Sequence, residues 1–548
     1  MERTFMTHEI RKSQEICGLW DFYPAISPDE KRRVTVPSCW ETYPGLESYQ
    51  GMGIYEKELY LDGRARFLFK GVSHTAQVYL DGKLIARHYN AYTPFEAEAE
   101  AAPGMHTLRV EVDNSFNEES ALHVPNDYYT YGGITRPVIV ESAGDLSIGK
   151  LHFTPYTRDE KWYARISAEI KNSRTEAVGV TLKVFLGEET CAEFCLAVPA
   201  GNSVLQQDTA FPNAVSYEPD KPILYRLQAV LYIDGEPVDD LIDRVGFREI
   251  KINGTDILYN GNKLKIRGFN RHEDHGQFGC AIPVEAMAAD LRLIMDTGAN
   301  AVRTCHYPND ERFLDLCDEL GLLVWEEAHA RGLSEEQMRH RNFRRQSLDC
   351  IDEMVENHYN HPCIFTWGIL NECASMTKYG REVYSEQFER IRSLDTSRPL
   401  TFASCHIDKD ICLDLPDIVS MNIYPLWYID ESPEAFLDHV YRWVQETPGK
   451  GKPFIISEIG AGAIYGCHAS HNPKWSEERQ AQILKEQLTS VLSHEKTSGV
   501  FIWQFCDCRV SEEWFARRPR GMNNKGIVDE YRRKKMAYET VKEIYHQM

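Results

Sequence analysis

Two glutamates stand where long apolar runs end. Glu372 follows the run CIFTWGIL by way of Asn371, and Glu458 directly follows PFIIS. A carboxyl group at the edge of a buried sheet loses water, which raises its pKa and suits it to general-acid work. Two such groups about 5 to 5.5 Å apart can act as acid/base and nucleophile at an acetal carbon. Either glutamate alone is also explained as a carboxylate that caps a following helix, and only the pair favours catalysis.

A second group of polar residues follows an earlier apolar run. His272, Glu273, Asp274 and His275 stand side by side, which is also the composition of a metal site. A strand that ends in a loop, however, lacks the helical i, i+4 spacing of an HExxH zinc site. We therefore predict no bound metal and expect His272 and Glu273 to hydrogen-bond within the site.

Aromatic residues follow several of the same runs. An indole or phenol ring at such a position can stack on the apolar face of a sugar, although core packing explains any one of them equally well. They are Tyr424, Trp427, Tyr428 and Trp503.

The elements that position these residues repeat a strand-then-helix order from about residue 252 onward. Eight apolar runs predict strands, at 263–270, 300–306, 322–328, 363–372, 400–405, 418–424, 453–459 and 499–505. Between them, apolar residues at helical spacing predict helices at 284–298, 310–321, 347–359, 381–394, 433–445 and 478–492. Eight β-then-α units over this length indicate a (β/α)8 TIM barrel, whose strand ends converge on one cavity at the C-terminal face.

The chain before the barrel is predicted to be all β. Short alternating runs such as RFLFKGV and HTLRVEVDNS, separated by Gly, Asp and Asn turns, predict a first β domain over residues 1–142. Closely spaced strands then predict an antiparallel sandwich over 143–250, followed by the barrel over 251–548.

Composition limits the partners. The chain has 548 residues and a formal net charge of -22, and without a basic stripe such a surface repels nucleic acid. No signal-peptide segment and no run of about 18 apolar residues occurs, so we expect a cytoplasmic protein without membrane partners. The 15 cysteines show no repeated spacing and are expected to be mostly free thiols.

Several motifs together resemble glycoside hydrolase family two, a family of retaining β-glycosidases. GFNRHED, NAVRTCHYP, WGILNE and PFIISEIG resemble its barrel signatures in order, while GLWDF, VPSCWE and VYLDGK resemble its N-terminal jelly roll, which an immunoglobulin-like sandwich follows. The resemblance implies that Glu372 is the acid/base and Glu458 the nucleophile. It also implies that no cofactor is needed and that the protein is a homo-oligomer.

The resemblance extends to substrate recognition. Asn523 and Lys525, in RRPRGMNNKG, resemble the Asn-x-Lys pattern with which β-glucuronidases bind the sugar carboxylate, and NIYPLWY and NDYYTYGGITRPV resemble further segments of those enzymes. It implies a retaining β-glucuronidase acting on small β-glucuronides or on oligosaccharides that contain glucuronic acid. The expected substrate-binding residues are Asp127, His306, Asn371, Tyr424, Tyr428, Trp503, Asn523 and Lys525. The short connection after WEEAHARGL resembles the open, loop-poor bacterial members.

Alternatives stay open at this stage. Arg518 or Arg520 can serve as the arginine that precedes Asn-x-Lys in familiar glucuronidases, and Arg312 is a further cation that suits the axial hydroxyl of a galacturonide. A β-galacturonidase or dual uronidase is therefore the nearest alternative function. A β-galactosidase and a non-catalytic carbohydrate-binding protein are more distant ones.

Overall fold

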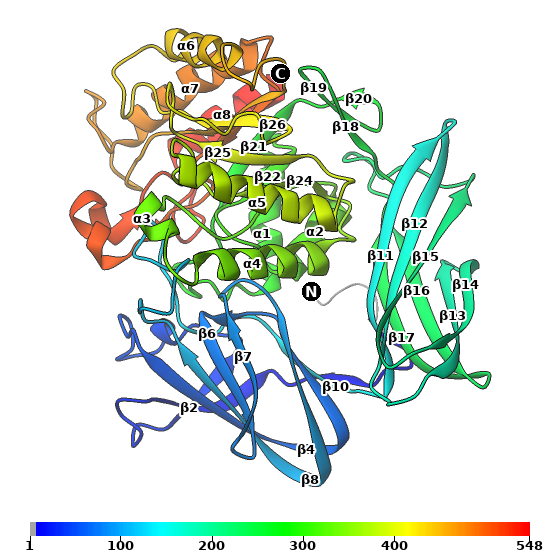
Figure 1. Ribbon diagram of the computed structural model, residues 1–548. Coiled ribbons are helices and arrows are strands. Elements are labelled where there is room, and N and C mark those ends of the chain that lie inside the picture. Colours follow the sequence, from blue (N-terminus) through cyan, green and yellow to red (C-terminus); the bar gives the residue numbers. More distant parts are fainter. Residues whose placement is uncertain (1–6, 548) are drawn as a thin grey trace.

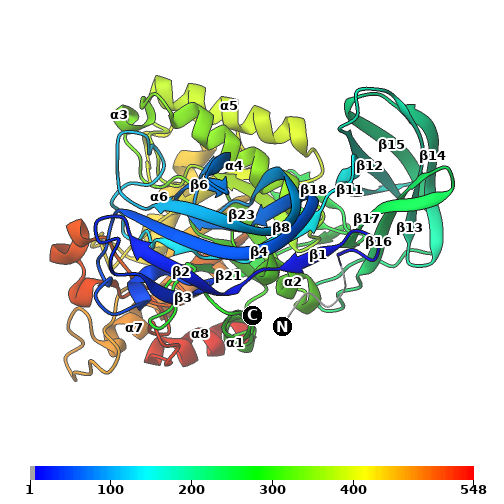
Figure 2. The same ribbon diagram turned by 90° about the horizontal axis from the view of Figure 1, so that it is seen from below.

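The computed structural model describes residues 7–547. Figure 1 shows two β-rich regions and a barrel surrounded by helices, with the first β region below the barrel and the second to its right. Seen from below, the first β region lies across the barrel in Figure 2, so it covers one flank of it. The expected multidomain architecture is confirmed, with β-rich N-terminal regions and a C-terminal barrel.

The first β region is dominated by two long strands, β4 and β8, which pair along almost their whole length. Its strands are β1 (Ser13–Glu15), β2 (Gly18–Pro24), β3 (Arg32–Val36), β4 (Met52–Phe69), β5 (Val72–Ser73), β6 (Thr75–Leu80), β7 (Lys83–Tyr89), β8 (Phe95–Asp113), β9 (Gly133–Ile134) and β10 (Val138–Ser142), with a 3-10 turn η1 (Trp40–Thr42). Apolar residues that alternate along these strands form one core between the layers.

The second β region is a sandwich of two antiparallel sheets, ordered β11-β12-β15 and β14-β13-β16-β17. Its strands are β11 (Leu146–Arg158), β12 (Lys161–Asn172), β13 (Val178–Leu186), β14 (Glu189–Val198), β15 (Gly201–Phe211), β16 (Tyr225–Ile233) and β17 (Glu236–Val245). A small sheet of β18 (Ile250–Asn253), β19 (Asp256–Tyr259) and β20 (Asn262–Lys263) leads into the barrel. The domain boundaries at 142/143 and 250/251 stay predictions, and the second of them falls at the start of β18.

All eight predicted barrel strands are present and close into a parallel barrel. They are β21 (Ile266–Arg271), β22 (Ala301–Thr304), β23 (Leu323–Glu327), β24 (Ile364–Ile369), β25 (Leu400–Ser404), β26 (Ile418–Asn422), β27 (Phe454–Ile459) and β28 (Gly499–Ile502). The helices are α1 (Val284–Asp296), α2 (Glu311–Leu320), α3 (Glu335–Met338), α4 (Phe343–His358), α5 (Lys378–Leu394), α6 (Pro433–Gln445), α7 (Glu477–Ser493) and α8 (Met536–Gln547).

The expected βα repeat lacks one helix, after β25, and has one long connection, between β28 and α8. Only turns connect β25 to β26, because residues 405–417 are too few and too polar for a helix that covers the sheet. After β28 the chain runs through irregular structure before α8, with a short strand pair β29 (Cys508–Arg509) and β30 (Met522–Asn523) and two 3-10 turns, η2 (Glu512–Arg517) and η3 (Pro519–Gly521). This long segment lies at the C-terminal face, where active sites of such barrels form.

The barrel interior is filled with side chains. Trp325 lies so close to β24 that a Cβ on Gly368 would meet its indole nitrogen at 2.1 Å, so only glycine fits there. The indole in turn lies under the Arg303 guanidinium, 4.7 Å from its ring centre. The N-terminal end of the barrel is closed by apolar residues from the sheet before it, among them Ile257 and Tyr259. The interior is therefore a packed core with the polar residues above it.

Three connections of the first β region contact the barrel, namely those between β7 and β8, between β8 and β9, and between β9 and β10. Arg136 donates to Glu273 at 2.8 Å in a buried ion pair, and the ring of Tyr92 stacks on Tyr307 at 3.8 Å. Tyr131 donates to Asp274 at 3.0 Å. These contacts hold residues 121–132 against the C-terminal face of the barrel.

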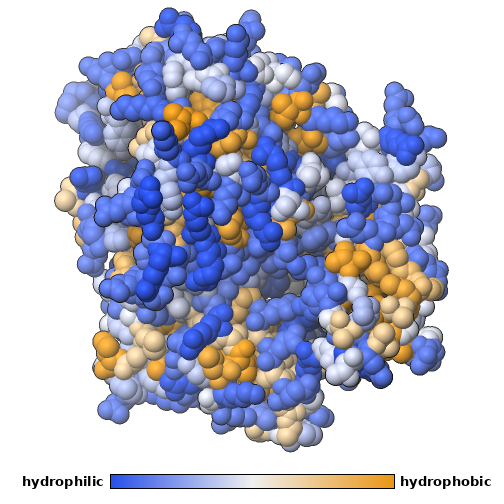
Figure 3. Space-filling model, in the orientation of Figure 1, coloured by the Kyte–Doolittle hydropathy of each residue, from blue (hydrophilic) through white to orange (hydrophobic). Residues whose placement is uncertain are grey.

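The surface is mostly polar on the side that Figure 3 shows, with several hydrophobic patches, one of which lies over the second β region. Among residues 7–547, no helix combines the length and the apolar character needed to cross a bilayer.

Candidate active site

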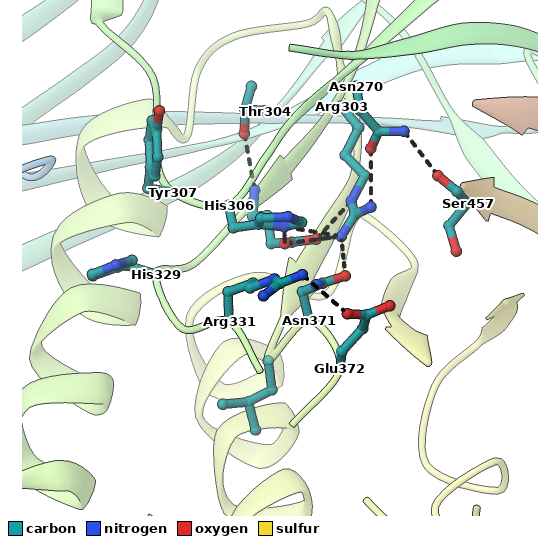
Figure 4. Close-up of polar contacts among 12 residues, drawn as sticks. Asn270, Arg303, Thr304, His306, Tyr307, His329, Arg331, Asn371, Glu372 and Ser457 are labelled. Atoms are coloured by element: carbon teal, nitrogen blue, oxygen red, sulfur yellow. Dashed lines mark hydrogen bonds and ion pairs between the residues drawn. The ribbon is translucent and has the colours of Figure 1, made fainter. Parts of the chain in front are cut away.

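Arg303, at the end of β22, is the centre of the polar network at the barrel mouth. Its guanidinium donates to Asn270 at 2.9 Å, to Asn371 at 2.8 Å, to Glu458 at 3.1 Å and to both oxygens of Glu327. Figure 4 shows part of this network, with Asn371 between Arg303 and the side of the site where Glu372 and Arg331 lie. One buried cation thus fixes side chains from four strands.

Glu458 lies within β27 and is 4% exposed. One of its oxygens accepts the hydrogen bond from Arg303, and the other accepts a hydrogen bond from the Tyr424 hydroxyl at 2.5 Å. Burial and the negative charge of Glu372 raise the pKa of the Glu458 carboxyl to about 7, although Arg303 and Tyr424 act to lower it. Both of its oxygens are thus oriented by donors, as a nucleophilic carboxylate requires.

Glu372 follows β24 and is more accessible, with 18% of its side chain exposed. Leu370 and Glu372 both have left-handed backbone conformations, with φ of 47° and 52°, which turn the chain sharply at the strand end. Asn422 donates to Glu372 at 3.0 Å, and a guanidinium nitrogen of Arg331 lies 3.5 Å from its other oxygen. The two glutamates therefore share one site in different surroundings, as acid/base and nucleophile roles require.

Asp127 enters the same mouth from the first β region. Arg518 donates to both of its oxygens, at 2.7 Å in one case, and Asn523 donates to one of them at 3.1 Å. The Lys525 ammonium lies beside this group, 5.6 Å from the ring centre of Tyr424 and 5.1 Å from that of Tyr428. Burial would raise the pKa of the Tyr428 phenol, but the charges of Lys525 and Arg518 lower it.

His306 and Trp503 form one wall of the site. Their rings stack at 5.0 Å, and His306 Nδ1 lies 2.9 Å from Glu327. The imidazole of His272 meets Trp503 edge-on at 5.3 Å. The structure therefore brings all ten residues predicted as catalytic or substrate-binding to one mouth, while the roles assigned to them stay predictions.

The structure places three further residues whose roles the sequence left open. Arg312 binds Asp310 at the start of α2 and lies near Glu15 and Cys17, away from the mouth, because an N-terminal helix carboxylate holds it there. Arg520 pairs with Glu530, so Arg518 is the arginine at the site. Trp427 packs on Trp475 at 5.2 Å in an apolar cluster that Tyr424 also contacts, so it supports the site by core packing.

The four side chains from His272 to His275 do not converge on one point. Glu273 pairs with Arg136, while Asp274 accepts hydrogen bonds from Tyr131 and from a backbone N–H. Among the described residues, two buried groups have metal-compatible donor spacing, and they are His272 with Cys305 and His306, and Asp318 with His361 and Cys363. In the second group, Asp318 already bonds both His361 and the backbone of Cys363.

Sequence reasoning missed Arg331 and Asn422. Arg331 stands four residues after the end of β23, and it also donates to Asn126 at 3.0 Å. Asn422 is the last residue of β26 and donates to both Asn371 and Glu372. The available signal was their position at or just after a barrel strand end.

Comparison with known proteins decides the family. Residues 250–548 match the description "Glycosyl hydrolases family 2, TIM barrel domain". The chain belongs to glycosyl hydrolase family 2. It is a glycosidase of that family, as the motifs implied.

Family 2 relatives cover nearly the whole chain. A β-glucuronidase of Paenibacillus borealis is 26% identical over 98% of this chain and 97% of its own length. A crystal structure of a β-galacturonidase from Eisenbergiella tayi bound to galacturonate is 53% identical, covers 100% of this chain and 99% of its own, and superposes with a TM-score of 0.98. A β-glucuronidase from Ruminococcus gnavus in complex with D-glucaro-d-lactam is 25% identical over 98% of each chain, with a TM-score of 0.87. The chain is thus similar to enzymes named for two different uronic acids.

Proposed function

We propose that this protein is a retaining β-uronidase that removes terminal β-linked uronic acids, with β-galacturonides as the preferred substrates. The observation that supports a uronic acid as the substrate is the environment of Lys525. Its side chain is buried, with 3% of the residue exposed, and among the described residues it makes no ion pair with a carboxylate. A buried ammonium without a carboxylate in ion-pair contact is costly, so an anionic group of the substrate would complete the site.

The carboxylate of the sugar would lie between Lys525 and Asn523. Lys525 supplies a positive charge and the Asn523 amide a hydrogen bond, while Arg518 is already bound by Asp127. Asp127 is held ionised, since Arg518 and Lys525 lower its pKa even though burial acts in the opposite direction. It can therefore accept a hydrogen bond from a sugar hydroxyl at this end of the site.

Catalysis would proceed in two displacements. Glu458 attacks the anomeric carbon while Glu372 protonates the departing glycosidic oxygen, and Glu372 then takes a proton from the water that hydrolyses the glycosyl ester. Arg303 and Tyr424 hold the Glu458 oxygens, and the positive charge of Arg303 favours the ionised nucleophile. The reaction as written uses only these side chains and water.

The preference for galacturonide rests on similarity. The Eisenbergiella tayi enzyme, 53% identical over the full length, is named as a β-galacturonidase, whereas the β-glucuronidase relatives named above are 25% and 26% identical. Galacturonic and glucuronic acids differ only in the orientation of one hydroxyl. The β-glucuronidase expected from the motifs is therefore the second candidate.

The test compares kcat/KM for the 4-nitrophenyl β-galacturonide, β-glucuronide and β-galactoside. We expect the galacturonide to be cleaved best and the neutral galactoside worst. Lys525→Ala should lower kcat/KM on both uronides by about 100-fold, since a hydrogen-bonded charge is worth about 1.5 to 3 kcal/mol, and should change galactoside cleavage much less.

Lys474→Ala is the matched control, because Lys474 also lies over an aromatic ring but is exposed, 4.6 Å from the Trp427 ring centre. Equal losses on all three substrates for Lys525→Ala would contradict the carboxylate role. Faster cleavage of the glucuronide would favour the second candidate. The homo-oligomer and the cytoplasmic location stay predictions from the sequence.

A further inference from the structure

The segment 511–521 forms a wall of the mouth that belongs to no barrel strand or helix. It contains η2 and η3 and appears in Figure 1 as the red-orange piece beside α3. Ser511 and Asn126 exchange two hydrogen bonds, at 3.0 and 3.1 Å, and Arg518 of the segment binds Asp127. The segment is thereby fastened to the first β region directly beside the sugar site.

Trp514 is the aromatic residue of this wall that faces the site. Its ring centre lies 5.8 Å from the guanidinium carbon of Arg331, 5.6 Å from that of Arg518 and 5.9 Å from that of Arg517. The indole is partly exposed, and Arg517 is exposed without an ion-pair partner among the described residues. In a chain with a net charge of -22, this is a local concentration of positive charge around one aromatic face.

The position of Arg331 relates Trp514 to the chemistry. Arg331 lies 3.5 Å from the carboxylate of Glu372, the proposed acid/base. An acid/base must touch the glycosidic oxygen, so the leaving group lies beside Glu372. Trp514 lies on the other side of the Arg331 guanidinium from Glu372's carboxylate contact, and so farther out on the side of the leaving group.

We propose that Trp514 and Arg517 form the subsite for the leaving group, and that this group is a sugar that carries a negative charge. The apolar face of the sugar would stack on the Trp514 indole, and its anionic group would lie beside Arg517. The inference rests on the proposed function, and it extends that function from single uronosides to acidic oligosaccharides. Phe515 belongs to the same 3-10 turn but packs on Gly521.

The experiment uses substrates with the same terminal uronic acid and different leaving groups. These are the methyl uronoside, a β-linked disaccharide of two uronic acids, and the same disaccharide with the carboxylate of its leaving unit methyl-esterified. Trp514→Ala should lower kcat/KM on both disaccharides by about tenfold, which corresponds to about 1.4 kcal/mol of stacking, and should leave the methyl uronoside within about twofold. Arg517→Ala should lower kcat/KM only on the unesterified disaccharide.

Two readouts separate this role from a structural one. Hydrolysis of the glycosyl-enzyme is common to all three substrates, so its rate should be unchanged in Trp514→Ala. Phe515→Ala, the matched control on the same turn, should behave like the wild type. Equal losses on all three substrates, or equal losses for Phe515→Ala, would overturn the subsite. If the wild type cleaved no uronoside, the proposed function would fall, and the subsite with it.

Discussion

At the scale of single residues, the two glutamates differ in what surrounds them. Glu458 is buried against Arg303 and Tyr424, whereas Glu372 is partly exposed and bound by Asn422. Burial, and after it the negative charge of Glu372, raise the pKa of the Glu458 carboxyl. The raised pKa of Glu458, about 7, means that this proposed nucleophile becomes fully ionised only above neutral pH.

The raised pKa of the Glu458 carboxyl should lower the free energy of unfolding at alkaline pH. Its folded pKa of about 7 lies above its ordinary value of 4.5, so its contribution to stability is complete below pH 4.5 and is lost as the pH rises through 7. Glu458→Gln should abolish turnover and raise the melting temperature above that of the wild type, by more at pH 8 than at pH 5. The full difference corresponds to about 3 kcal/mol.

Calorimetry at the two pH values measures this effect. Glu543→Gln, on the exposed side of α8, is the control and should shift the melting temperature little at either pH. A gap between Glu458→Gln and the wild type that does not depend on pH would count against the shifted pKa of Glu458.

At the scale of elements, the close packing of strand β24 inside the barrel positions Glu372, the proposed acid/base. Gly368 packs on Trp325, and three residues later the chain turns through Asn371 into Glu372. The strand end is therefore positioned by the packing below it. The segment 511–521 is positioned in part by the first β region, since Ser511 and Arg518 bind Asn126 and Asp127 of that region.

Gly368→Ala tests the packing of β24. The added Cβ would meet Trp325 at 2.1 Å, and overpacking of this kind costs about 1 to 3 kcal/mol. We expect a lower urea midpoint for the barrel, and a larger loss in kcat than in binding because Glu372 is displaced. Gly179→Ala in β13, where no atom lies within 4 Å of the new Cβ, is the control. Unchanged stability of Gly368→Ala would show that Trp325 moves freely.

At the scale of the whole molecule, the site is completed by contacts between the β regions and the barrel. Asp127 reaches the barrel mouth only because residues 121–132 are held there, with the buried pair of Arg136 and Glu273 as one anchor. The two β regions are joined in turn by Arg11, which binds Asp239 and contacts Glu141. Activity in the barrel therefore depends on how the first β region docks.

Arg136→Met tests this dependence. Breaking a buried ion pair costs about 3 to 5 kcal/mol, because Glu273 is left charged without its partner. We expect a lower melting temperature, faster proteolysis of the loop 121–132, and a loss of kcat/KM on uronides. The double variant Arg136→Met with Glu273→Gln should recover part of the stability.

The control is Lys70→Met. Lys70 pairs with Glu311 at 2.9 Å across the same two regions, but the pair is partly exposed and should contribute less than about 1 kcal/mol. If Arg136→Met behaved like Lys70→Met, docking would not depend on the buried pair.

The sequence was sufficient for what local patterns encode. Runs of apolar residues and their periods predicted the eight barrel strands and six of the helices, since buried parallel strands and amphipathic helices leave such patterns in the chain. Glu372, Glu458, Asn523 and Lys525 were found because they follow those runs or stand in a motif.

The tertiary structure decided which distant charges meet. Asp127 and Arg518 are 391 residues apart, and nothing local distinguishes Arg518 from Arg520, or Arg331 from the many arginines of the surface. Closure of the barrel and docking of the first β region place Arg518 and Arg331 at the mouth and leave Arg312 at the start of α2. Ion pairs depend on distances of a few ångströms, and such distances between remote segments exist only once the chain has folded.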